Sequence, residues 1–168
     1  MRRRTAARLA SRRKAPDLTG GIEPAERPGS PELVFASEAW LEALGRELSS
    51  AGPLPGESAL RLGQLIAGAG GEVEAEWVLV LEGGSPPRLE TGAGSTRRAD
   101  VTLVEDASSA FELASGSATA SDLLAAGRLK IRGDPRLLTA NAEMIEAVAR
   151  ATTSLSRSCH ILPMTAAR

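Results

Sequence analysis

Hydrophobic and polar residues alternate through much of the first half of this chain, as they do in strands with one buried face. The clearest example is EVEAEWVLVL (72–81), in which Trp77 and Leu79 share one face and Glu76 lies on the other. Turns rich in Gly, Pro and Ser separate this segment from its neighbours. The pattern predicts strands at residues 59–67, 72–81, 88–92, 99–105 and 129–133.

Apolar residues three and four positions apart indicate helices before and after the first four strands. The first helix begins after Ser37, a suitable N-cap, and ends before SSAGPLPG (49–56). The last begins with Asp134 as N-cap and Pro135 at the first helical position, and its apolar stripe continues for about 20 residues. Two shorter helices lie between them, with N-caps and C-terminal glycines at Asp106 and Gly116, and at Thr119 or Ser121 and Gly127.

This order of elements is typical of the α+β class. Strands that follow one another directly form a mainly antiparallel sheet, and the later helices cover one face of it. Residues 15–32 are dense in Pro, Gly and charge, and residues 156–168 lose apolar periodicity. We therefore expect a disordered basic head and linker over 1–32, one folded domain over 33–155 and a disordered tail over 156–168.

The composition excludes several classes of protein. One cysteine and one histidine in 168 residues rule out an intrachain disulfide and a zinc site of about four Cys or His ligands, and argue against haem or iron–sulfur clusters. No apolar run approaches the ~18 residues of a membrane span. We expect no metal, no cofactor and a cytoplasmic protein.

Charge is unevenly distributed along the chain. Residues 1–14 hold seven of the 20 basic residues and no acidic one, which leaves 13 basic and 21 acidic residues from Ala15 onward, a net charge of −8. An acidic body with few aromatic residues is a poor nucleic-acid surface, so no nucleic-acid partner is expected. The basic head is interpreted as a solvated tail, with an electrostatic tether to anionic lipid as the alternative.

Candidate catalytic groups are few. Cys159 and His160 are adjacent but fall in the predicted tail, where nothing would orient a base. Asp106 is more useful as a helix cap than as an acid beside Glu105. The glycine-rich segments GAGG (68–71) and TGAGS (91–95) resemble hairpin turns and match no phosphate-binding loop. We therefore predict that the domain is not an enzyme.

A sequence with few candidate catalytic or metal-binding groups is compatible with lipid binding. Burying one methylene contributes about 0.8 kcal/mol, so ten would contribute roughly 8 kcal/mol before the costs of binding. That gross value corresponds to an affinity near micromolar without any polar motif. The inward apolar faces of the strands and helices are interpreted first as a packed core and second as the lining of a lipid cavity.

The segment from Ala99 to Leu138 resembles the sterol carrier protein 2 family. It contains an ADVTL strand, a short helix that ends in Gly116, a second helix, and GRLKIRGD (127–134). The segments EWVLVLEGG and FASEAWLEAL are also similar to family members. The order and spacing of these pieces extend the resemblance over roughly 33–150.

The resemblance implies a five-stranded sheet with helices on one face and an apolar tunnel between sheet and helices. In the family this cavity takes sterols, fatty acids, fatty acyl-CoA or phospholipid without covalent chemistry. The candidate lipid-binding residues on this chain are Trp77, Leu79, Val101, Leu103, Phe111, Leu113, Leu124, Leu129, Ile131, Leu138, Met144, Ile145 and Val148.

The functional prediction is therefore non-catalytic binding and transfer of a fatty acid, fatty acyl-CoA, sterol-like or isoprenoid molecule, with transient membrane contact at the tunnel mouth. One alternative is a protein-interaction module whose cavity is closed. Another is an auxiliary subunit of a lipid-thioester enzyme.

The sequence also departs from some members of the family. The acidic body and the AAR ending differ from peroxisomal members, and the low aromatic and Met content disfavours bulky sterols. The Ala- and Arg-rich composition indicates a bacterial source.

Overall fold

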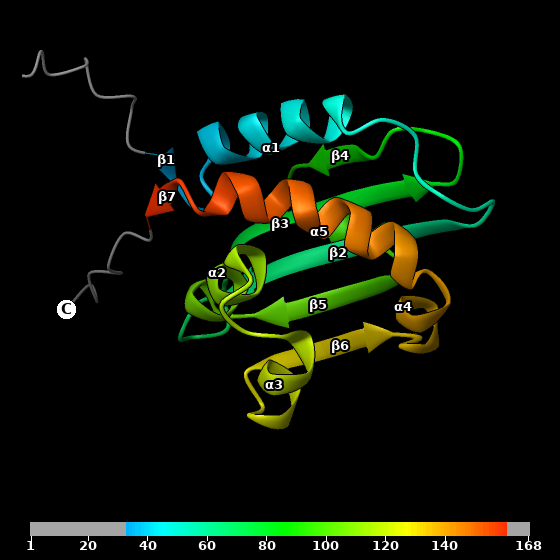
Figure 1. Cartoon of the computed structure of the whole chain (residues 1–168). Coiled ribbons are helices and arrows are strands. Elements are labelled where there is room, and N and C mark those ends of the chain that lie inside the picture. Colours follow the sequence, from blue (N-terminus) through cyan, green and yellow to red (C-terminus); the bar gives the residue numbers. More distant parts are fainter. Residues whose placement is uncertain (1–32, 161–168) are drawn as a thin grey trace, which may run out of the picture. The chain divides into compact units, whose positions relative to one another are not determined.

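A five-stranded sheet forms the base of the domain in a computed structural model, which describes residues 33–160 (Figure 1). The strands lie in the order β4-β3-β2-β5-β6. Their bounds are Ala59–Ala67 for β2, Val73–Glu82 for β3, Arg88–Thr91 for β4, Val101–Glu105 for β5 and Leu129–Gly133 for β6. Within this sheet only β2 and β5 pair in parallel, and the other three neighbouring pairs are antiparallel. The predicted mainly antiparallel sheet of five strands is confirmed.

The helices lie on one face of this sheet, as predicted for an α+β fold (Figure 1). Their bounds are Glu38–Ser50 for α1, Ala107–Ser115 for α2, Ala120–Ala125 for α3, Arg136–Ala140 for α4 and Ala142–Ser156 for α5. A short 3-10 helix, Ser95–Arg98, connects β4 to β5. Helix α5 runs over the middle of the sheet, α1 packs at the side of β4, and α2 and α3 cover the side of β5 and β6 (Figure 1).

Side-chain caps explain where three of these helices begin. Ser37 Oγ accepts a hydrogen bond from the Trp40 amide at 3.2 Å, and Asp106 accepts one from the Ser109 amide at 2.7 Å. Thr119 forms a capping box with Asp122 at the start of α3. The predicted N-caps Ser37, Asp106 and Thr119 are therefore confirmed, and Asp106 has the structural role expected of it.

The single long helix predicted after Asp134 is wrong, because the chain breaks at Asn141. This residue leaves helical geometry, with φ −114° and ψ 23°, and separates α4 from α5. Its amide group donates a 2.8 Å hydrogen bond to the Leu137 carbonyl, which competes with the helical backbone pattern. The N-cap of α4 is Pro135, whereas Asp134 accepts hydrogen bonds from the Arg136 amide and guanidinium.

The predicted start of the tail at residue 156 is also wrong for the first residues of that segment. Helix α5 extends to Ser156, which is fully buried. Beyond it, β7 (Cys159–His160) pairs in parallel with β1 (Leu33–Val34), and the Phe35 amide donates to the His160 carbonyl at 3.1 Å. The domain therefore includes residues 156–160, while the head (1–32) and residues 161–168 lie outside the described residues.

Every aromatic residue of the sequence belongs to one cluster at one end of the core. The ring centroids of Phe35 and Trp40 are 4.7 Å apart, those of Trp40 and Trp77 are 5.6 Å apart, and those of Phe35 and Phe111 are 5.5 Å apart. The cluster joins α1 and α2 to β3. The rest of the core is mostly aliphatic, with Met144 and Cys159 added to it.

Candidate functional site

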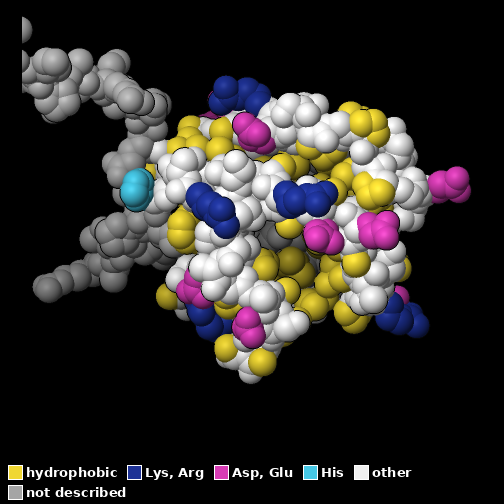
Figure 2. Space-filling model, viewed as in Figure 1, with side chains coloured by type: hydrophobic (Ala, Val, Ile, Leu, Met, Phe, Trp, Pro, Cys, Tyr) yellow, Lys and Arg dark blue, Asp and Glu magenta, His cyan; other side chains and the backbone are white. Residues whose placement is uncertain are grey.

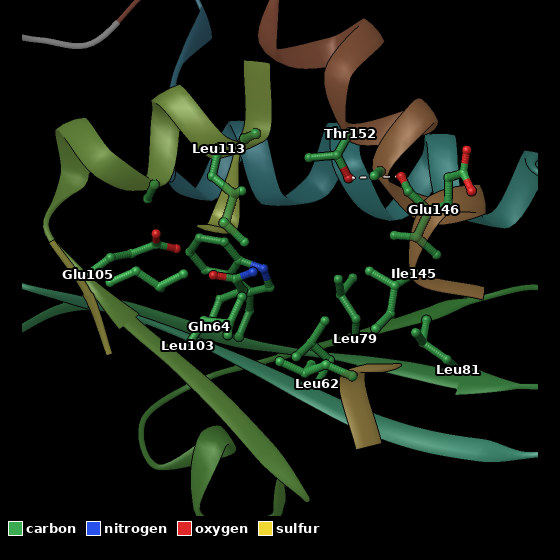
Figure 3. A pocket seen from close by; sticks show the side chains of 18 of the residues that line it. Leu62, Gln64, Leu79, Leu81, Leu103, Glu105, Leu113, Ile145, Glu146 and Thr152 are labelled. Atoms are coloured by element: carbon green, nitrogen blue, oxygen red, sulfur yellow. Dashed lines mark hydrogen bonds between the residues drawn. The ribbon is translucent and has the colours of Figure 1, made fainter. Parts of the chain in front are cut away.

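A cavity of about 480 Å³ lies between the sheet and the helices (Figure 3). Its floor is formed by β2, β3, β5 and β6, and its roof by side chains from all five helices, α1 to α5. Nearly all of the lining side chains are aliphatic or aromatic. A pocket of this size falls within the roughly 300–1,000 Å³ range of small-molecule binding sites.

Strand register determines which side chains form the floor. Gln64 of β2 lies opposite Trp77 of β3 and opposite Leu103 of β5, and Leu103 lies opposite Ile131 of β6. These residues form one row across the sheet, and residues two positions along each strand point to the same face. Leu79, two positions from Trp77, therefore faces the cavity as well.

The mouth of the cavity lies between α3 and the first half of α5. The exposed lining residues come from these two helices, and they are Ala120, Leu124, Ala142, Glu146 and Ala149. Leu124 keeps 40% of its surface exposed, which is unusual for a leucine in the described domain. Figure 2 shows the corresponding hollow, with hydrophobic side chains visible inside it.

Most of the side chains predicted from the sequence to bind lipid surround this cavity. Those that line it are Trp77, Leu79, Leu103, Leu113, Leu124, Leu129, Ile131, Leu138, Ile145 and Val148. Three others do not line it: Val101 and Met144 are buried in the surrounding core, and Phe111 is half-buried against Phe35. The structure thus brings together the predicted residues of the sheet and of the covering helices, and their role in lipid binding stays a prediction.

Several lining residues were missed by the sequence analysis as site residues. The apolar ones include Phe35, Trp40, Leu44, Leu62 and Leu81. Two of them could have been identified from the sequence, because Leu62 and Leu81 continue the apolar alternation of β2 and β3. Phe35 had no such signal, since it lies between a two-residue strand and a helix cap.

The polar lining residues are more informative. Thr152 donates its hydroxyl to the Val148 carbonyl at 3.1 Å, and Glu146 is exposed at the rim. Glu105 is only 3% exposed, and neither of its carboxyl oxygens has a hydrogen-bond partner within residues 33–160. Burial, with a smaller contribution from the neighbouring Asp106 charge, raises the pKa of Glu105 to about 7. The half-buried Gln64 lies on the same face of the sheet, opposite Leu103.

Cys159 and His160 do not form the arrangement of a nucleophile and its base. The Cys159 side chain is buried and donates its thiol to the Leu155 carbonyl at 3.1 Å, whereas His160 is exposed. Burial raises the pKa of the Cys159 thiol, which is the opposite of what activates a cysteine.

Within residues 33–160 no group of three or more His, Cys, Asp or Glu side chains is placed to hold a metal ion. In the same range, no helix combines the length and hydrophobicity needed to cross a membrane.

Comparison with known proteins gives one family and related structures. The model of the SCP-2 sterol transfer family matches residues 64–146. No curated protein matches the sequence. The fold is similar to a conserved hypothetical protein, possibly a sterol carrier protein, from Thermus thermophilus, with 18% identity, a TM-score of 0.50, and coverage of 76% of this chain and 93% of that one. Palmitated sterol carrier protein 2-like 2 from Aedes aegypti is 21% identical, with a TM-score of 0.48 and coverage of 66% and 95%.

The family match spans β3, β4, β5, β6 and all of α2, α3 and α4, which together supply most of the floor and part of the mouth of the cavity. The likeness to the Thermus structure adds that the sheet and its covering helices have this fold. Through residues 64–146, this chain belongs to the SCP-2 sterol transfer family.

Proposed function

We propose that this domain binds a lipid reversibly in the cavity beneath α5 and transfers it without covalent chemistry. Membership of a sterol transfer family supports lipid binding and transfer in general. The observation that carries the proposal for this chain is the cavity itself, about 480 Å³ in volume and lined almost entirely by apolar side chains. Removing a hydrocarbon chain from water into such a space is favourable by about 25 cal/mol per Å² of apolar surface.

The proposed ligands are fatty acid, fatty acyl-CoA, sterol-like or isoprenoid molecules. The lining is mainly Leu, Ile, Val and Ala, with aromatic rings gathered at one end. An aliphatic lining of this kind favours flexible hydrocarbon chains. The mouth between α3 and α5 would let a large head group such as CoA remain outside while the chain is buried.

Transient contact with a membrane is part of the proposal. Leu124 lies at the mouth and is 40% exposed, so it is available to enter the surface of a bilayer. Such contact would let a lipid pass between membrane and cavity without crossing water. We place this activity in the cytoplasm, as the sequence analysis predicts.

The alternative of an interaction module rests on a closed cavity, and the open volume beneath α5 argues against it. The alternative of a thioester enzyme subunit rests on the pair Cys159 and His160, but the Cys159 thiol is buried and already donates a hydrogen bond. Neither alternative has an observation of its own in the described residues, so lipid carriage is preferred.

The test is native mass spectrometry of gently purified full-length protein, followed by solvent extraction. The proposal predicts a discrete added mass that releases a lipid, or uptake of a lipid by delipidated protein from a mixed panel of fatty acids, acyl-CoA, phospholipids and isoprenoids. A protein that carries no lipid and takes up none of the panel would contradict it.

A further inference from the structure

We propose that Glu105, with Gln64 beside it, binds the polar end of the lipid, and that this end is a hydrogen-bond donor that carries no negative charge, such as a hydroxyl or a protonated amine. This inference rests on the proposed function, because it specifies the chemistry of the ligand for the same cavity. Three features of the cavity carry it: the isolation of one buried carboxyl group, its position, and the signs of the charges around it.

The Glu105 carboxyl is buried without compensation from the protein. It is only 3% exposed, and both oxygens lack a hydrogen-bond partner within residues 33–160. Leaving a buried polar group unsatisfied costs about 1–3 kcal/mol, and more when it is charged. Such groups are rare in folded proteins, and each calls for an explanation, of which a bound molecule that completes its hydrogen bonds is one.

Glu105 and Gln64 both line the cavity. Leu103 lies opposite Gln64 in the parallel pair of β2 and β5, so Glu105, two residues further on, is the diagonal neighbour of Gln64 on the same face. Figure 3 shows both side chains at one end of the cavity and Leu81 towards the other. A ligand whose head group reaches Glu105 would therefore extend its chain along Leu79, Leu81 and Ile145.

The charges around the cavity select against an anionic head group. Within residues 33–160, the ionisable residues that line it are Glu105 and Glu146, and no Lys, Arg or His is among the lining residues. Arg128 precedes the strand position opposite Glu105, but both of its terminal nitrogens are held by the Glu112 carboxylate at 2.8 Å. An ionised carboxylate or phosphate inside the cavity would lie near these carboxyl groups in an environment of low dielectric constant. Its binding would therefore be opposed by repulsion and by the cost of desolvation. A hydroxyl or an amine would instead donate to Glu105, and an amine would be attracted to its charged form.

The experiment compares four ligands with the same hydrocarbon chain on delipidated full-length protein: tetradecylamine, tetradecanol, myristate and methyl myristate. Each is added below its micelle-forming concentration, and its affinity is measured by displacement of a fluorescent lipid. We expect the amine and the alcohol to bind wild type about tenfold more tightly than myristate and the ester, as one charge-assisted or well-buried hydrogen bond predicts.

Variants then assign the preference to one side chain. Glu105→Leu should remove the advantage of the amine and the alcohol while leaving methyl myristate unchanged, and Glu105→Gln should retain the alcohol but lose the amine. Glu143→Gln, exposed on α5 and outside the cavity lining, is the matched control and should keep the wild-type ranking. Thermal unfolding of each variant checks that the fold is intact.

The outcomes separate this inference from the proposed function. If none of the four molecules binds wild type, lipid binding itself fails. If all bind but myristate equals or exceeds the amine and the alcohol, or if Glu105→Leu preserves the wild-type ranking, the cavity is a lipid site and the role assigned to Glu105 is wrong.

Discussion

The Asn141 side chain accepts a 2.7 Å hydrogen bond from Ser58, a residue that lies 83 positions earlier in the chain. Asn141 is buried and forms the break between α4 and α5, and Ser58 directly precedes β2. The bond therefore attaches the start of α5 to the beginning of the central strand β2. Because α5 roofs the cavity and borders its mouth, this contact holds one side of the candidate site in place.

Replacing Asn141 with Ala should lower the free energy of unfolding by about 1–3 kcal/mol, because the Ser58 hydroxyl and the Leu137 carbonyl would each lose a partner. Ser58→Ala alone should cost less, since Asn141 keeps its bond to Leu137. Urea unfolding of both single variants and the double variant measures the coupling between them. Strictly additive effects would mean that the two side chains do not interact in solution.

The pH dependence of stability should report the buried Glu105. A glutamate releases its proton near pH 4.5 in the unfolded chain, whereas the pKa of Glu105 in the folded domain is about 7. Its stabilising contribution is therefore complete below pH 4.5 and is lost as the pH rises through 7, by about 3 kcal/mol. Urea unfolding of wild type and Glu105→Gln should show equal stability near pH 4 and a more stable variant at pH 8.

Glu105→Asp is the matched control for this effect, because it keeps a buried carboxyl and should keep the fall in stability with rising pH. A difference between wild type and Glu105→Gln that stays constant from pH 4 to pH 8 would contradict the prediction. It would mean that folding does not raise the pKa of Glu105.

The floor of the cavity could be predicted from the sequence because strand geometry has a fixed period. Once Leu79 and Leu103 are assigned to inward positions, their neighbours two residues away share that face. The same rule places Glu105 inward, on the face of Leu103. The sequence analysis instead considered Glu105 with its neighbour Asp106, as a candidate acid at a helix start, and so overlooked its direction.

Two other features could not be read from periodicity. The apolar stripe after Pro135 continues through Asn141 without interruption, so the stripe gives no sign of the break or of the hydrogen bond that Asn141 accepts from the distant Ser58. The pairing of β1 with β7 involves only two residues on each strand, which is too short for an alternation to appear. Both features involve contacts between distant parts of the chain.

Filling the cavity should reduce lipid uptake without unfolding the domain. Ala114 of α2 lines the cavity, so Ala114→Phe would place a ring in the space that a hydrocarbon chain needs. We expect lipid binding to weaken by about tenfold, because roughly two methylenes of the ligand would lose their place. Displacement of a fluorescent lipid measures this effect. Ala39→Phe is the control, since Ala39 is exposed on α1 and lies outside the lining; equal loss in both variants would contradict the assignment of the site.

The Cys159 thiol should react slowly with alkylating reagents in the native protein. It is buried within the core, donates to the Leu155 carbonyl and has a raised pKa, so little thiolate is present near neutral pH. Mass spectrometry after iodoacetamide treatment should detect modification only when urea unfolds the domain. Rapid labelling of the folded protein would indicate an accessible thiolate and would revive the thioester-enzyme alternative.

Lipid transfer between vesicles should depend on the exposed leucine at the mouth. Leu124 is 40% exposed on α3 and borders the opening. Replacing it with Ser removes part of an apolar side chain that would enter the bilayer, a loss of about 1 kcal/mol that corresponds to a roughly fivefold slower transfer.

Val73 provides the control for this test, because it is also exposed, at 53%, but begins β3 and does not line the cavity. The rate of fluorescent lipid transfer between neutral vesicles should fall for Leu124→Ser and remain near the wild-type value for Val73→Ser. Equal rates for all three proteins would show that transfer proceeds through water rather than by contact at the mouth. A loss of equal size in both variants would instead show that apolar exposure anywhere on the domain promotes collision, and the mouth would lose its special role.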